Sequence, residues 1–380
     1  MRQKLRKFFV LALAGIMCIM TVSCNGFGQK TQEENQKEYK IVLLGKESYV
    51  YSDQGFIKGM ELALEQVQAQ GIALTFEHVD DKGEYEQGVL VGGELAKDPS
   101  VLAVFTFQDF EIIEALASVF EEAKKPLVSV QGCYETTLQA GYDCFISAFT
   151  SAGDMGKAIA NYCAESGIER VACSHTGTEF EREEMRGFER QARENGVTVV
   201  DMLQGPNTMT DLKSTYYRWE KLQVDAVYMA HLTYSDTEWM LEMITYLKEQ
   251  NPDLKILSDY SLNNEETLKK YGDVLEGVVI TAPYSVAESQ EEKEFRKQFE
   301  EIYGFEASNV AIQGYDLVQI MAELLKEGIN PKDFAEQLKR KEGFAGITGQ
   351  ICFEEDGRLT GITPQFLVVK NRHFVEFSGK

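Results

Sequence analysis

Residues 101–133 read VLAVFTFQDFEIIEALASVFEEAKKPLVSVQGC, and they set the pattern that much of the chain repeats. The apolar run 101–105 is typical of a parallel strand that is buried on both faces. Apolar residues then recur at helical spacing over 112–120, with glutamates on the opposite side. A second apolar run, 126–130, ends the stretch. The pattern therefore predicts a strand, a helix and a second parallel strand.

A turn follows each of these two strands. The first turn is 107–110, and the second is 131–133. In an open parallel sheet, ligands bind just beyond the carboxyl ends of the strands. We therefore expect both turns to lie side by side on the rim of a ligand-binding cleft.

The rest of the chain predicts an α/β protein with two doubly wound parallel-sheet lobes. Strands and helices alternate from residue 39 to about 148, and a second series of the same kind follows to about 282. The remaining segment fits neither series. It contains three predicted helices and then a predicted hairpin, in which 346–353 pairs with 365–369 around the turn Glu355-Asp-Gly357. We expect the chain to cross back between the lobes there.

Residues 1–23 are predicted to be a signal peptide. Four basic residues precede an apolar run of 15 residues, 8–22, which is shorter than the roughly 20 that span a membrane. Thr21-Val-Ser-Cys24 then resembles a bacterial lipobox with Thr where Leu is usual. Lipidation of Cys24 would make 24–38 a polar tether to the membrane. The alternative is an ordinary secretory signal without lipid.

Charge and cysteine content narrow the class of protein further. Without residues 1–23 the chain has 34 basic and 61 acidic residues, a net charge of −27. Such a surface argues against nucleic-acid binding, which needs Lys and Arg to contact phosphates.

Five cysteines remain besides Cys24, and none forms a Cys-x-x-Cys pair. They are expected to be small buried residues. For Cys133 and Cys144 the alternative is a disulfide between them.

Motifs for catalysis are scarce. The chain has no phosphate-binding loop, no Gly-x-Ser-x-Gly elbow, no His-Glu-x-x-His motif and no dinucleotide fingerprint. His175 and His231 end predicted strands, where they either line the cleft or face solvent. Asp80-Asp81 is either a metal or acid pair or a helix cap. We therefore predict no enzyme activity, no metal and no cofactor.

Aromatic residues after strand ends are a stronger signal. Those that follow predicted strands are Tyr49, Tyr51, Phe107, Phe110, Phe180, Tyr260 and Tyr284. Several rings that converge on one rim indicate a binding pocket, whereas the alternative is that each has a separate packing role.

Several motifs, in this order, resemble those of a known family. They are Tyr51-Ser-Asp-Gln54, Gly59-Met-Glu-Leu-Ala63, Asp80-Asp81, Pro126-Leu-Val-Ser129, Leu275-Glu-Gly-Val-Val-Ile-Thr281, Gly314-Tyr-Asp316, and Gly346-Ile-Thr-Gly-Gln-Ile-Cys-Phe353 with Asp356-Gly357. The chain is similar over 39–375 to bacterial solute-binding lipoproteins of the type I periplasmic-binding fold. Within that fold it resembles the branched-chain amino-acid-binding (leucine/isoleucine/valine-binding) proteins of ABC transporters.

The resemblance implies two lobes joined by a hinge of three strands. Lobe one would contain 39–148 and 283–350, and lobe two would contain 149–282 and 351–380. The crossings would lie near Phe149, Ala282 and Ile351. A ligand would be enclosed by hinge closure between the lobes.

The resemblance also implies a set of ligand-binding residues. In the family a hydroxyl and backbone amides hold the ligand carboxylate, at positions that correspond here to Phe110, Gln131 and Cys133. The acidic partner of the ligand ammonium corresponds to Tyr260, with Asp259 beside it. The whole predicted set is Tyr51, Phe107, Phe110, Gln131, Gly132, Cys133, Phe180, Leu232, Asp259 and Tyr260.

The missing hydroxyls and the added rings predict a ligand with a planar or apolar body. The alternative is an aliphatic amino acid bound through backbone groups. We expect a membrane-anchored, extracytoplasmic lipoprotein that delivers a small solute to the permease and ATPase subunits of an ABC importer. A sensor that docks on a membrane receptor is a second hypothesis, and an enzyme on this scaffold is a third.

Overall fold

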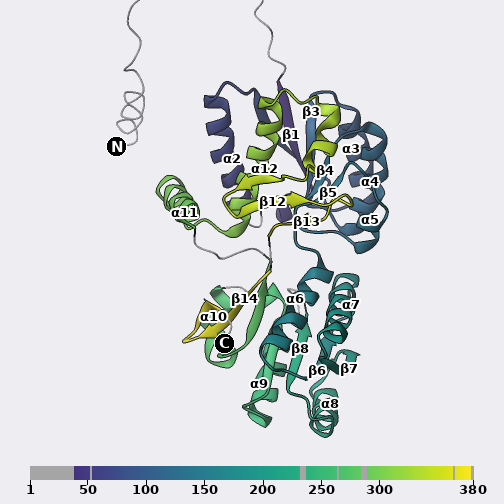
Figure 1. Ribbon diagram of the computed structural model, residues 1–380, viewed down its shortest axis with the longest axis vertical. Coiled ribbons are helices and arrows are strands. Elements are labelled where there is room, and N and C mark those ends of the chain that lie inside the picture. The colour runs from purple at the N-terminus through teal and green to yellow at the C-terminus, as the bar shows by residue number, and fades with distance from the viewer. Residues whose placement is uncertain are drawn as a thin grey trace, which may run out of the picture. The chain divides into compact units, whose positions relative to one another are not determined.

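A computed structural model describes residues 38–51, 54–231, 237–262, 265–283, 289–362 and 364–377. These residues form two α/β lobes, each built on its own sheet (Figure 1). The predicted signal peptide, most of the tether, Cys24, Leu232 and Tyr284 lie outside the described residues. None of the helices in the described part is long and apolar enough to cross a membrane.

The sheet of lobe one is entirely parallel, with the order β2-β1-β3-β4-β5. Its strands are β1 (Tyr39–Leu44), β2 (Leu74–Val79), β3 (Val101–Thr106), β4 (Leu127–Ser129) and β5 (Phe145–Ser147). The helices of this lobe are α1 (Glu47–Val50), α2 (Gln54–Ala69), α3 (Tyr85–Lys97), α4 (Phe110–Ala123), α5 (Glu135–Gln139), α11 (Gln290–Tyr303), α12 (Asn309–Lys326) and α13 (Phe334–Leu338), with the 3-10 turn η3 (Pro331–Asp333). The predicted strand–helix–strand unit of residues 101–133 is confirmed as β3, α4 and β4.

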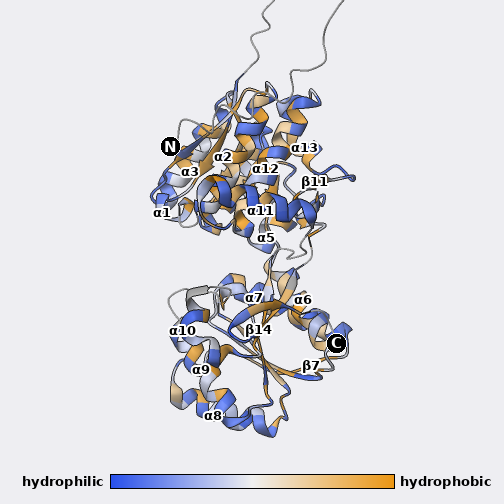
Figure 2. Ribbon diagram, turned by 90° about the vertical axis from the view of Figure 1, so that its left-hand side faces the viewer, coloured by the Kyte–Doolittle hydropathy of each residue, from blue (hydrophilic) through white to orange (hydrophobic). Residues whose placement is uncertain are grey.

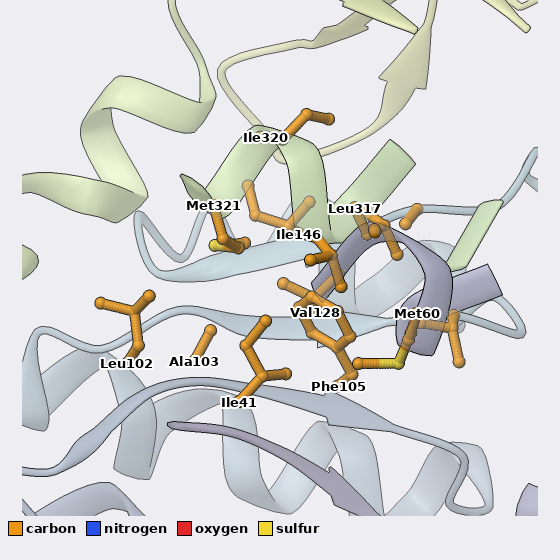
Figure 3. Packing of buried hydrophobic residues seen from close by; sticks show 14 of the residues in the cluster. Ile41, Met60, Leu102, Ala103, Phe105, Val128, Ile146, Leu317, Ile320 and Met321 are labelled. Atoms are coloured by element: carbon orange, nitrogen blue, oxygen red, sulfur yellow. The ribbon is translucent and has the colours of Figure 1, made fainter. Parts of the chain in front are cut away.

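Both faces of this sheet are apolar because successive side chains of a strand point to opposite sides. In β1, Ile41 and Leu43 pack toward α2 and α12, whereas Val42 and Leu44 pack toward α3 and α4. Figure 3 shows Ile41, Phe105 and Val128 of the sheet packed with residues of α2 and α12. The continuous apolar runs of the sequence therefore form strands that are covered by helices on both sides.

Lobe two has a mixed sheet with the order β15-β14-β10-β9-β8-β6-β7. Its strands are β6 (Arg170–His175), β7 (Thr198–Gln204), β8 (Ala226–Ala230), β9 (Lys255–Ser258), β10 (Val279–Ala282), β14 (Gln365–Lys370) and β15 (His373–Glu376). The helices are α6 (Ala152–Glu165), α7 (Glu179–Glu194), α8 (Met209–Lys221), α9 (Thr237–Gln250) and α10 (Glu265–Leu275), with the 3-10 turn η2 (Tyr260–Leu262). Hydrophobic residues concentrate in the strands of this sheet, whereas much of α11 in lobe one is hydrophilic (Figure 2).

The third sheet corrects two expectations about the C-terminal part. It consists of β11 (Phe344–Gly346), β12 (Gly349–Phe353) and β13 (Leu359–Thr360). The predicted hairpin is wrong, because β12 pairs with β11 and β13, whereas β14 pairs with β10 and β15. Ile351, Phe353 and Leu359 are buried in the core of lobe one, so the last crossing lies between β13 and β14 and not near Ile351. A crossing at Ile351 would expose this apolar surface to water.

The chain passes between the two lobes three times: after β5, after β10 and after β13. The first crossing, 148–151, is irregular backbone and not the expected strand. The Thr150 Oγ1 donates to the Pro283 carbonyl at 2.8 Å, which connects the first crossing to the second. Ser147 at the end of β5 forms an isolated parallel bridge with Arg358, which lies directly before β13. The Arg358 Nη1 also donates to the Ser151 Oγ at 2.8 Å, so the first crossing is bonded both to the second crossing and to the residue that precedes β13.

Each lobe contains a pair of helices that only glycine allows to pack so closely. A Cβ on Gly59 of α2 would lie 1.9 Å from the Ala311 carbonyl oxygen of α12, and one on Gly314 would lie 2.4 Å from the Phe56 carbonyl oxygen. In lobe two a Cβ on Gly156 of α6 would lie 1.9 Å from a carbonyl oxygen of α7. The partner atoms are backbone, so an added methyl group forces the helices apart.

We predict that Gly59→Ala destabilises the protein by about 1–3 kcal/mol, because overpacking against rigid backbone outweighs the helix propensity of alanine. The free energy of unfolding, measured in urea, tests this. The matched control is Gly93→Ala in α3, where a Cβ meets no atom within 4 Å. That variant should be as stable as the wild type or up to about 1 kcal/mol more stable. Equal effects of the two substitutions would contradict the close packing of α2 and α12.

Candidate functional site

A cavity of about 380 Å³ lies at the carboxyl ends of the lobe-one strands, where lobe one meets the turn η2 of lobe two. Its lining residues are Tyr49, Val50, Phe56, Phe107, Phe110, Val130, Gln131, Phe149, Tyr260, Val310 and Gln313. They come from α1, α2, the turn after β3, the start of α4, the turn after β4, the first crossing, η2 and α12. The position agrees with the rule that ligands bind beyond the strand ends of an open parallel sheet.

The described lining is aromatic and aliphatic, and it carries no formal charge. Six of its side chains are aromatic, three are valines and two are glutamines. Phe56 and Phe107 meet edge to face, with ring centroids 5.0 Å apart. Phe149 and Tyr260 meet in the same manner at 5.8 Å. The cavity therefore offers ring faces for stacking and two carboxamides for hydrogen bonding.

Gln313 of α12 holds one wall of the cavity in place. Its Nε2 donates to the Val130 carbonyl at 3.2 Å and to the Ala148 carbonyl at 2.6 Å. These bonds fix the end of β4 to the first crossing, and they leave the amide oxygen to accept a hydrogen bond. Gln313 and Val310 were not among the site residues predicted from the sequence. A buried polar residue one position before Gly314, on the apolar face of a helix, was the signal that could have found it.

Four of the predicted residues line the cavity together: Phe107, Phe110, Gln131 and Tyr260. Gly132 lies directly behind them. It has φ of 105°, and a Cβ there would lie 3.6 Å from both Phe110 and Phe149. The Ser129 Oγ donates to its carbonyl oxygen. Glycine suits this position because the backbone is left-handed and two lining rings lie close by.

Tyr51, Phe180 and Cys133 do not line the cavity. Tyr51 is 44% exposed and packs its ring edge to face on His78, with centroids 5.3 Å apart. Phe180 of α7 is buried behind Phe110, at a ring distance of 6.1 Å. Cys133 turns into the apolar core that contains α4, because its small thiol fills space there, and burial raises its pKa to about 12. Cys133 and Cys144 are both free thiols, so the alternative of a disulfide between them is wrong.

Asp259 stabilises the fold through hydrogen bonds and does not line the cavity. Its carboxylate is fully buried and accepts hydrogen bonds from the His231 and Ser261 backbone N–H groups, each at 2.8 Å, and from the Ser261 Oγ. Burial raises its pKa to about 6. His231 lies beside it, and its Nε2 is 2.9 Å from the Ser174 Oγ. This network joins the ends of β6, β8 and β9.

Asp80 and Asp81 bind backbone groups at the end of β2. The Asp80 Oδ1 accepts from the N–H of Glu47, the first residue of α1, and from the Lys82 N–H. Asp81 accepts from the Gly83 N–H and from the Gln108 Nε2. Asp80 thus caps α1, whereas Asp81 holds the turn after β2 and the Gln108 side chain. In the described part of the chain, no group of His, Cys, Asp and Glu side chains could hold a metal ion.

Comparison with known proteins points to one family. The sequence profile of the periplasmic binding protein family matches residues 39–368. Among curated proteins, no sequence matches the chain.

Several solved structures share the fold. An ABC transporter substrate-binding protein from Desulfitobacterium hafniense has a TM-score of 0.80 at 23% identity, covering 90% of this chain and 100% of its own. A leucine-binding protein from Thermotoga maritima has a TM-score of 0.70 at 18% identity, covering 90% and 98%. A solute-binding protein from R. palustris in complex with benzoate has a TM-score of 0.68 at 18% identity, covering 90% and 96%. The profile match spans most of the chain, and this protein therefore belongs to the periplasmic binding protein family.

Proposed function

We propose that this protein captures a small solute in the aromatic cavity and delivers it to the permease and ATPase subunits of an ABC importer. The observation that carries the proposal is the cavity itself, whose walls come from lobe one, from the first crossing and from Tyr260 of lobe two. A ligand that touches both lobes favours the arrangement in which they enclose it, by its differential affinity for that arrangement. The fold neighbours described as ABC transporter substrate-binding proteins support this role.

The lining favours a ligand with a planar or apolar body and few charged groups. The carboxylate of Asp259 already accepts three hydrogen bonds, and Tyr260 is a neutral phenol that lacks a charge-assisted contact to an ammonium group. Six aromatic rings and two carboxamides suit an aromatic or amide-like compound. Fold neighbours have been solved with leucine and with benzoate, so an aliphatic amino acid is the alternative that the experiments below separate.

We further propose that lipidated Cys24 anchors the protein outside the cytoplasmic membrane. The order of basic, apolar and small residues up to Cys24 carries this proposal, and the family is named for a periplasmic location. The second candidate function, a sensor that docks on a membrane receptor, uses the same cavity. Adjacent genes for permeases and ATPases would favour transport over sensing.

A thermal-shift screen of residues 25–380 tests the binding function. A ligand at 100 times its Kd adds about 2.7 kcal/mol to the free energy of unfolding and raises the melting temperature accordingly. We expect aromatic carboxylates and aromatic amides to give larger shifts than leucine, isoleucine and valine. Larger shifts with the aliphatic amino acids would reverse the assignment of the ligand class. No shift with any small metabolite would contradict the binding function.

Tyr260 is predicted to contribute through its ring. Tyr260→Ala should weaken binding of the best ligand of the screen by about 1–3 kcal/mol, as loss of a buried aromatic contact does. Tyr260→Phe keeps the ring and should retain most of the affinity. Calorimetry measures all three proteins, with Tyr51→Ala as the matched control because Tyr51 lies outside the cavity. A Tyr260→Ala protein that binds like the wild type would contradict the aromatic pocket.

Lipidation is predicted to depend on Cys24 alone. When the full chain is expressed in a bacterium, the wild type should partition into the detergent phase, because several acyl chains together give stable membrane binding. Cys24→Ser should leave the protein in the soluble fraction. Cys18→Ser, within the signal peptide, is the control and should partition like the wild type. A wild-type protein that is soluble and begins at residue 25 or later would exclude lipidation.

A further inference from the structure

A carboxylate of lobe two caps a helix of lobe one. The Glu183 Oε1, on α7, accepts a hydrogen bond from the backbone N–H of Glu135 at 2.8 Å. Glu135 is the first residue of α5, and the side chain of Tyr134 at the N-cap makes no capping hydrogen bond. Helix N-termini leave N–H groups that need acceptors. The second lobe thus supplies the acceptor that the first lobe lacks.

This contact lies next to the ligand cavity and uses the same elements. Phe180, one turn earlier on α7, packs against Phe110, which lines the cavity. Phe110 in turn contacts the ring of Tyr134, the residue before Glu135, at 5.1 Å. If α7 separates from lobe one, the hydrogen bond between Glu183 and Glu135 therefore breaks, and the Phe110 side of the cavity loses its cover at the same time.

Glu183 is nearly buried although it faces a groove. Its side chain is 5% exposed, and the groove beside it has a volume of about 370 Å³. The groove is lined by α5, α6, α7 and Arg358, which follows the turn before β13. Water in a groove of this size gives protons a route to the carboxylate while the lobes remain in contact.

The cation beside Glu183 is paired more closely with another carboxylate. The Arg186 Nη2 is 3.9 Å from the Glu183 Oε1, but it lies 2.6 Å from Glu179. Arg358 of lobe one binds Glu135 at 2.5 Å and the Ser151 Oγ at 2.8 Å.

Other charged side chains line the same groove. They are Asp154 and Lys157 from α6, and Arg190 and Glu194 from α7. Asp154 lies 3.5 Å from Arg358 and forms an ion pair with it.

Burial raises the pKa of Glu183 to about 7, and the charge of Glu135 acts in the same direction. The Glu135 N–H and Arg186 oppose the rise, but they do not cancel it. Separation of the lobes removes the Glu135 N–H and the cover of lobe one from this carboxylate, which moves its pKa back toward the ordinary 4.5. A carboxylate whose pKa is higher when the lobes meet binds protons more tightly in that arrangement.

We propose that closure of the two lobes is coupled to binding of one proton by Glu183. The proton comes from water in the groove and binds Oε2, while Oε1 continues to accept from the Glu135 N–H. Because the closed arrangement has the higher proton affinity, it is favoured below neutral pH and loses this advantage as the pH rises to about 7 and beyond. The inference rests on the proposed function in one respect, that ligand capture requires this closure.

The expected size of the pH effect on closure follows from the pKa of Glu183 in the open and in the closed arrangement. A group that titrates near 4.5 with the lobes apart and near 7 with the lobes closed makes the closing equilibrium about tenfold weaker at pH 8 than at pH 6. Apparent ligand affinity falls by the same factor where the open form predominates.

The first experiment needs no ligand. Small-angle scattering of residues 25–380 at pH 6 and pH 8 compares the wild type with Glu183→Gln, which keeps an oxygen acceptor but cannot titrate. The wild type should have the larger radius of gyration at pH 8, whereas Glu183→Gln should have the same radius at both. Glu194→Gln removes a carboxylate of the same helix and groove and should follow the wild type. A wild-type radius that is independent of pH, or a pH response that Glu183→Gln retains, overturns the proposal.

The second experiment separates this proposal from the proposed function. Calorimetry uses benzamide, phenylalanine and leucine as probes, whose charges are nearly constant between pH 6 and pH 8. Any probe that binds should bind the wild type about tenfold more weakly at pH 8, and Glu183→Gln should show no such change. If no probe binds while the radius still responds through Glu183, the assigned ligand class fails and the proton coupling stands. If a probe binds with pH-independent affinity, the coupling fails and the binding function stands.

Discussion

The close contact between α2 and α12 is the constraint on which lobe one depends. Gly59 and Gly314 bring the two helix backbones into direct contact, although these glycines are 255 positions apart in the chain. Without α12 the apolar face of the sheet that carries Ile41 and Phe105 would lose the helix that packs beside α2. The same helix brings Val310 and Gln313 to the cavity, so the packing that completes the core also completes the site.

The acidic groups near the strand ends are used to hold the fold, and this gives the cavity its neutral lining. Asp81 and Asp259 are fully buried, and both accept hydrogen bonds from backbone N–H groups. Glu181 is likewise buried and accepts from the Thr176 and Gly177 N–H groups before α7. A buried carboxylate needs such donors because its desolvation is otherwise costly. Rings and carboxamides remain to form the described lining.

Two kinds of contact join the lobes beside the cavity, and they respond to different conditions. The rings of Phe110 and Phe180 meet through apolar surface, which is insensitive to pH. Glu183 accepts a hydrogen bond from the Glu135 N–H of lobe one, and Arg358 of lobe one forms an ion pair with Asp154 of lobe two. Under the proposed function, the lobes enclose a solute and later release it. Contacts of modest strength between the lobes suit such a cycle better than one large apolar interface.

The sequence by itself determined the α/β class, the two lobes and the edge of the sheet where the cavity lies. Apolar runs, helical spacing and turns are local patterns, and parallel strands leave their carboxyl ends at one edge. Only the tertiary structure decided which way each side chain faces at that edge. Phe107, Phe110, Gln131 and Tyr260 line the cavity, whereas Cys133 and Asp259 turn away, because strand alternation no longer applies beyond the last strand residue. Long-range packing likewise decided the place of the last crossing and the roles of Gln313 and Glu183, since their partners lie in segments far away in the chain.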